Sequence, residues 1–95
     1  METKSKTTFS LGICVATPGA IEALLESEQS AVEFLARHVR GDWGDVPEFD
    51  AQENDVSVEK GARILSAYST WLGKRLWIIT EADRSVTTIL TPEEY

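Results

Sequence analysis

This sequence has few residues that could form a disulfide bond or bind a metal ion: its 95 residues include one cysteine, Cys14, and one histidine, His38. A single cysteine excludes a disulfide within the chain. A structural zinc site would have to rely on carboxylates for its remaining ligands, which is rare, so we expect no metal and no cofactor. Cys14 lies in an apolar segment, residues 11–16, and is predicted to be a small buried side chain rather than a reactive thiol.

Long apolar runs are also missing. No run approaches the roughly 20 residues that a membrane-spanning helix needs, and the first segment is too polar for the core of a signal peptide. The hydrophobic fraction of 42% and charged fraction of 26% are ordinary for a globular protein. We therefore expect one domain, residues 1–95, located in the cytoplasm without membrane contact, with residues 1–6 disordered.

Basic residues are scarce, and the net charge is −7. Residues 21–59 hold eleven acids against two arginines, a net charge of −9. An acidic surface repels nucleic-acid phosphates and attracts basic partners. The charge therefore favours a basic protein partner and disfavours nucleic-acid binding, except as the substrate of a ribonuclease. The alternative is that acidic helices only keep a small protein soluble.

The first half of the chain predicts a strand followed by helices. Residues 7–16 are mostly apolar and typical of a strand. Thr17 is a good N-cap and Pro18 suits the first helical position. Ser30 has the spacing of a capping box and begins a second helix, which Gly41 is placed to end.

A third helix, near residues 48–58, is the most polar and is expected to be peripheral. Its candidate packing residues are Phe49, Ala51, Val56 and Val58. Residues 62–70, 75–80 and 86–90 then predict three strands joined by short turns. The whole is an α+β domain: a lead β-strand, two to three helices, then an antiparallel three-stranded meander. The sheet has three to four strands, because the lead strand is expected to join it at an edge.

Four polar residues are the candidates for catalysis. His38 is of the usual type for a general base near neutral pH, and Tyr68, Glu81 and Arg84 would supply acid and cation for metal-independent cleavage of a phosphodiester. This requires His38 to lie over the sheet. The alternative is structural: His38 bonds the last carbonyls of its helix, and Glu81 pairs with Arg84 across their own turn.

Other residues are candidates for binding. Trp43 either stacks on a ligand or packs between the helices and the sheet. The acidic candidates for contact with a basic partner are Glu22, Glu26 and Glu33. The remaining candidates are Arg40, Asp42, Ser66, Thr80 and Thr87.

Three segments carry a resemblance to a known family. They are residues 11–20 (LGICVATPGA), residues 37–44 (RHVRGDWG) and residues 77–95, which end in PEEY. In this order and spacing they resemble a family of small bacterial plasmid-related proteins of unknown function. The resemblance covers nearly the whole chain. It implies a bacterial protein carried on plasmids and other mobile elements, with no established activity.

A second resemblance concerns the order of elements alone. Helices followed by an antiparallel sheet that bears polar residues are similar to the barnase–EndoU–colicin–RelE-like nuclease fold. That resemblance implies a ribonuclease or toxin with the four catalytic candidates above at its site. This chain departs from such nucleases in charge, because they are usually basic.

Three hypotheses follow. The first is an acidic accessory protein of mobile elements that binds a basic protein, for example to inhibit a host defence or nucleic-acid enzyme. The second is a small metal-independent ribonuclease or toxin. The third is a homodimer formed through a sheet edge or the Trp43 region.

Overall fold

The computed structural model describes residues 9–95 of the chain. The expected disorder of residues 1–6 and the first two residues of the expected lead strand lie outside this range. The elements, in chain order, are β1 (Ile13–Ala16), α1 (Pro18–Ser27), α2 (Ala31–Val39), α3 (Glu48–Lys60), β2 (Ile64–Ser69), β3 (Arg75–Thr80), β4 (Val86–Leu90) and the 3-10 helix η1 (Pro92–Glu94).

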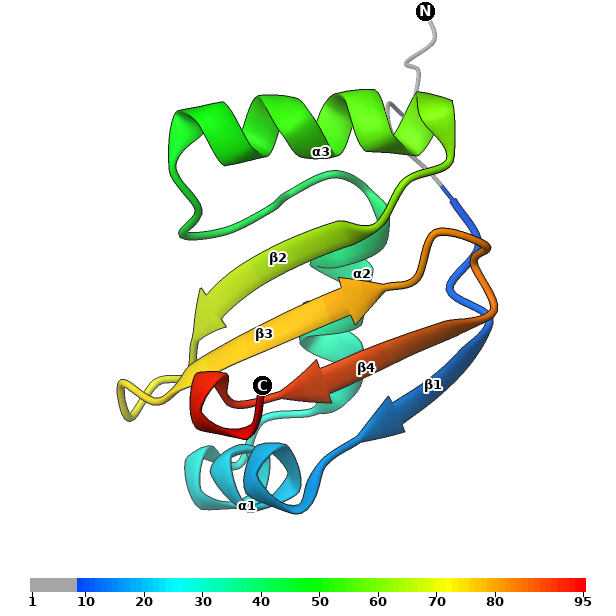
Figure 1. Ribbon diagram of the computed structural model, residues 1–95. Coiled ribbons are helices and arrows are strands. Elements are labelled where there is room, and N and C mark those ends of the chain that lie inside the picture. The colour runs from blue at the N-terminus through cyan, green and yellow to red at the C-terminus, as the bar shows by residue number, and fades with distance from the viewer. Residues whose placement is uncertain (1–8) are drawn as a thin grey trace, which may run out of the picture.

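The four strands form one mixed sheet in the order β1-β4-β3-β2 (Figure 1). β2, β3 and β4 are the predicted antiparallel meander, and β1 joins β4 in parallel at an edge. The α+β class and the edge position of the lead strand are thus confirmed. Within residues 9–95, no helix is long and apolar enough to cross a membrane.

The helix boundaries follow from local chemistry. The hydroxyl of Thr17 accepts a hydrogen bond from the amide of Ala20 at 3.3 Å, and that of Ser30 accepts one from Val32 at 3.1 Å. Both are the predicted N-caps. Gly61, with φ of 75°, ends α3 in the left-handed conformation that glycine adopts without strain.

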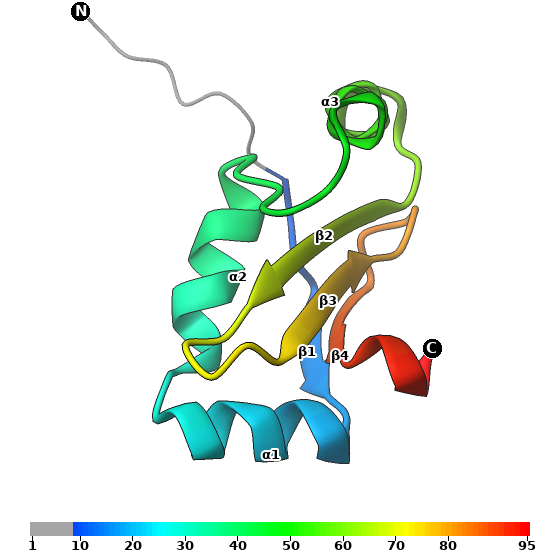
Figure 2. The ribbon, with the colours of Figure 1, turned by 90° about the vertical axis from the view of Figure 1, so that its left-hand side faces the viewer.

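The core lies between one face of the sheet and α1 and α2. Figure 2 shows α2 along that face and η1 on the opposite side. Residues at alternate positions of β2 and β3, among them Tyr68, Leu76 and Ile78, are buried there against Phe34 of α2.

The packing prediction for Cys14 is wrong, and that for the peripheral helix α3 is wrong for Phe49 and Val56, while Ala51 and Val58 are half-buried. Cys14 is exposed rather than buried, because β1 is an edge strand and does not lie under the helices as a central strand would. The side chain of α3 that is buried is polar Asn54, whereas Phe49 and Val56 are 69% and 50% exposed. α3 lies along the β2 edge of the sheet (Figure 1). The unpaired backbone groups of this edge need hydrogen-bond partners, which a polar side chain of α3 supplies and an apolar one does not.

Candidate functional site

His38 points from α2 onto the sheet and is completely buried. Its Nδ1 lies 2.5 Å from Ser66 Oγ and its Nε2 lies 2.9 Å from Thr80 Oγ1. The rings of Phe9 and Trp43 contact it edge-on, at centroid distances of 5.3 and 5.9 Å. The imidazole is thus closed off by two hydroxyls and two aromatic rings.

The hydrogen bonds continue beyond the imidazole and fix its tautomer. Thr87 donates its hydroxyl proton to the carbonyl of Leu11 at 2.7 Å, so it must accept from Thr80, whose hydroxyl oxygen is 2.7 Å away. Thr80 must then accept from Nε2–H of His38. Nδ1 is left to accept from the hydroxyl of Ser66. Every polar atom of this network is satisfied by a neutral His38.

Burial, and to a smaller extent the positive charge of Arg84, lowers the pKa of His38 to about 4. A neutral imidazole is therefore the stable form at pH 7. With no exposed surface and both nitrogens bonded to hydroxyls, it has no contact with a substrate. His38 lies over the sheet as the catalytic hypothesis requires, but the polar network around it is built into the core.

Tyr68 is also held as a structural group. Its hydroxyl donates to the carbonyl of Asp42 at 2.6 Å, and the guanidinium of Arg37 lies over its ring at 4.6 Å. Burial raises the pKa of Tyr68 to about 12. The hydroxyl therefore keeps its proton near neutral pH and ties β2 to the segment that follows α2.

Arg84 has φ of 62° and turns back toward the chain. Its guanidinium donates to the carbonyls of Ala62 and Ser57 at 2.7 and 2.9 Å, and also to that of Glu81 at 3.1 Å. The Glu81–Arg84 ion pair, part of the structural alternative for these residues, does not form within the described residues, because backbone carbonyls engage Arg84 instead. Arg84 joins the β3–β4 turn to the end of α3.

The four catalytic candidates consequently do not meet in an open cleft. His38, Ser66, Thr80 and Thr87 form one buried chain of hydrogen bonds, while Tyr68 bonds a loop. The candidates His38, Ser66, Thr80 and Thr87 therefore lie together, but they bond one another inside the core.

The segment after α2 accounts for three binding candidates. Asp42 pairs with Arg37 at 2.7 Å, which lowers the pKa of the Asp42 carboxyl, and Arg40 donates to the carbonyl of Ala36 at 3.3 Å. Trp43 is 5% exposed and its indole N–H donates to Asp55 of α3 at 3.0 Å. Of the two interpretations of Trp43, the structure therefore shows packing between the helices and the sheet.

The acidic candidates on α1 line a small groove. Glu22 and Glu26 border a space of about 220 Å³ with Glu93, Glu94 and Lys74. Glu94 is satisfied internally: bonds from the Thr17 hydroxyl and from backbone amides lower the pKa of its carboxyl to about 2. Glu33 is exposed on α2, outside this groove.

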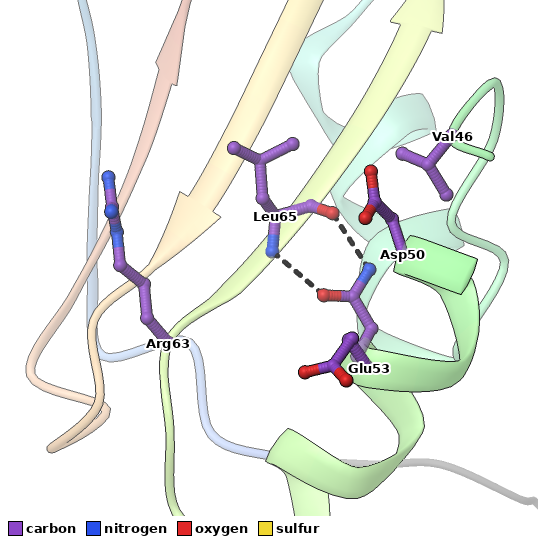
Figure 3. A pocket seen from close by; sticks show the side chains of 6 residues that line it. Val46, Asp50, Glu53, Arg63 and Leu65 are labelled. Carbon is purple, nitrogen blue, oxygen red and sulfur yellow. Dashed lines mark hydrogen bonds between the residues drawn. The ribbon is translucent and has the colours of Figure 1, made fainter. Parts of the chain in front are cut away.

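A larger groove, of about 310 Å³, lies between α3 and β2 and was not anticipated from the sequence. Its lining residues are Val46, Asp50, Glu53, Asn54, Arg63 and Leu65. Asn54 bonds the backbone N–H and C=O of Leu65, which Figure 3 shows as dashed lines, with Asp50 and Glu53 nearby on α3. The i,i+3 spacing of these two acids was visible in the sequence, but only the fold places them next to a sheet edge.

The acidic residues therefore occupy separate places. α1 and α3 lie at opposite ends of the molecule in Figures 1 and 2, so residues 21–59 do not form one continuous acidic face. Among residues 9–95, no group of three or more acidic, histidine or cysteine side chains is arranged to hold a metal ion. Comparison of the chain with family models, curated proteins and solved structures finds no match.

Proposed function

We propose that this chain is a binding protein that presents α3 to a basic protein partner. The observation that carries the proposal is the composition of α3: in 13 residues it buries only Asn54 and displays five carboxylates. These acids are Glu48, Asp50, Glu53, Asp55 and Glu59. Packing against the sheet does not account for such a helix.

Apart from Asp55, which accepts a hydrogen bond from Trp43, the acids of α3 make no side-chain hydrogen bond or ion pair among residues 9–95. Within residues 9–95 the two ion pairs involve Asp42 and Asp45, which precede α3. Lys60 is the one base in α3. Each exposed pair with a partner is worth only about 0.2–1 kcal/mol, so several charges acting together would speed association and select a basic surface.

α3 also offers apolar contact. Phe49 and Val56 are seven residues apart, which places them on the same side of the helix. They are 69% and 50% exposed. An exposed aromatic ring surrounded by polar residues is typical of a protein interface, where such residues supply much of the binding energy.

The helix is held firmly enough to act as a docking element. The side chain of Asn54 donates to the carbonyl of Leu65 at 2.8 Å and accepts from its amide at 3.2 Å. The bond from Trp43 to Asp55 adds a second attachment, at the next residue of the helix. Both attachments leave Phe49 and most of the carboxylates available.

The resemblance to plasmid-related proteins would make this chain an accessory factor of mobile elements. Its partner would then be a host defence or nucleic-acid enzyme, whose phosphate-binding surface is basic and complementary to α3. The ribonuclease hypothesis gains no support from the geometry, because His38 is buried and neutral.

The proposal predicts that charge reversal on α3 abolishes partner binding. Tagged wild-type protein would be used to retain proteins from bacterial cytosol at low salt, with quantification by mass spectrometry. The double variant Asp50→Lys/Glu53→Lys should lose at least 90% of a specifically retained basic protein. The matched control, Glu22→Lys/Glu26→Lys, makes the same charge change on α1 and should retain it.

Salt gives the second criterion. Electrostatic binding through several carboxylates should weaken at least tenfold between about 0.05 and 0.3 M NaCl, because the Debye length falls below the spacing of exposed charges. Equal losses in the α1 and α3 variants, or a complex that is insensitive to salt, would contradict docking through α3.

A further inference from the structure

The two edges of the sheet differ in whether their outward backbone groups are hydrogen-bonded. At the β2 edge, Asn54 bonds both backbone groups of Leu65, and Ala67 bonds the segment after α2 through Trp43 and Asp45, at 3.1 and 2.6 Å. The outward backbone groups of these two β2 residues are therefore satisfied. β1, at the other edge, has no such cover from any described segment.

The pairing of β1 shows which of its groups are open. Ile13 donates to the carbonyl of Ser85, which directly precedes β4, and Thr17 donates to that of Ile89 in β4. In a parallel pair, alternate residues bond the neighbouring strand, so the N–H and C=O of Cys14 and Ala16 face outward. Within residues 9–95, no backbone bond from a turn or loop reaches these two residues.

The side chains of β1 lack the features that protect edge strands. The strand has no charged residue and no proline, and it contains two β-branched residues. Ile13 is 70% exposed, Val15 is 44% exposed, and Cys14 is exposed as well. Such an edge is a template for pairing with another strand.

We infer that the β1 edge pairs with the β1 edge of a second copy of this chain, antiparallel about a two-fold axis at Val15. In this register, Cys14 of each copy faces Ala16 of the other. Both are hydrogen-bonded pairs, which gives four reciprocal bonds and satisfies the outward groups of the strand. The two Val15 side chains meet at the axis, and Ile13 lies nearby on the same face of a continuous eight-stranded sheet.

Charge favours a second copy as the occupant. β1 and α3 border opposite edges of the sheet (Figure 1), so edge-to-edge pairing through β1 places the two acidic α3 helices at the far ends of the dimer. Two chains of charge −7 can therefore pair through a strand that has no charged side chain. A basic partner would find no carboxylate in β1 and be drawn to α3 instead.

The oligomeric state tests this inference. Sedimentation of the wild-type chain over a range of concentrations up to about 1 mM should give a monomer–dimer equilibrium, at the low end of affinity expected of a small interface. Val15→Lys should raise the dimer dissociation constant at least tenfold. The matched control Leu25→Lys changes a residue of α1 that is 73% exposed and should leave the constant unchanged.

A second variant and a cross-link test the register. Cys14→Pro removes the outward N–H while leaving the bonds to β4, and proline is tolerated on edge strands, so it should also give a monomer that unfolds cooperatively. In the wild-type dimer the two Cys14 residues are diagonal neighbours about 7–8 Å apart, within reach of a short bismaleimide. A wild-type monomer at every concentration, a dimer that survives both edge variants, or a dimer in which Cys14 does not cross-link would overturn the inference.

Discussion

Lowering the pH from 7 to 4 is expected to cost the protein about 3 kcal/mol of unfolding free energy through His38. The folded pKa is about 4, because the imidazole is buried, while the unfolded pKa is 6.5. Between pH 4 and pH 6.5, His38 is protonated in the unfolded chain and neutral in the folded chain. Stability is therefore full above pH 6.5 and falls as the pH drops toward 4, by about 1.4 kcal/mol for each unit of pKa difference.

Urea unfolding at pH values between 7.5 and 4 measures this effect. The control is His38→Gln, whose amide offers a donor and an acceptor to Thr80 and Ser66 but does not titrate. This variant should be less stable at pH 7 and should lose much less stability on acidification. The Glu94 carboxyl, with its pKa of about 2, is present in both proteins and cancels in the comparison. Parallel pH profiles of the two proteins would show that His38 is not held neutral.

Gly44→Ala is expected to destabilise the protein by about 3–5 kcal/mol. Gly44 has φ of 77° and bridges to Ala67 of β2. A β-carbon there would collide with the carbonyl oxygen of Ala67 and lie 2.6 Å from Cδ1 of Tyr68. The segment after α2 would be pushed away from the β2 edge, which would break the bonds that cover it.

Gly61→Ala is the matched control for this prediction. Gly61 also has positive φ, of 75°, but a β-carbon there meets nothing within 4 Å. It should cost about 1–2 kcal/mol, the strain of the left-handed conformation alone. Urea unfolding of the two variants separates strain from collision. Equal losses would contradict the close approach of residues 43–45 to β2.

Much of the fold was predictable because it depends on local signals. Thr17 and Ser30 are strong N-caps, and Gly61 ends a helix in the left-handed conformation that glycine adopts without strain. These signals act over a few residues and do not require knowledge of what packs where. They are sufficient for the order of elements and for the class of the domain.

The site was less predictable because its contacts are distant in sequence. His38 and Thr80 are 42 residues apart, and nothing local indicates that a hydroxyl satisfies each imidazole nitrogen. Cys14 is exposed because β1 lies at an edge of the sheet, and the apolar sequence of β1 does not indicate that position. The burial of Asn54 serves a strand edge that only the fold creates.

The most direct test of the central claim is a map of amide chemical shifts on the wild-type chain during titration with the protein that it retains from cytosol. Docking through α3 predicts shifts concentrated between Phe49 and Val56. The indole N–H of Trp43 should shift with them, because it bonds Asp55. Shifts confined to α1 and η1, or to β1, with α3 and Trp43 unchanged would contradict the proposal that α3 is the docking surface.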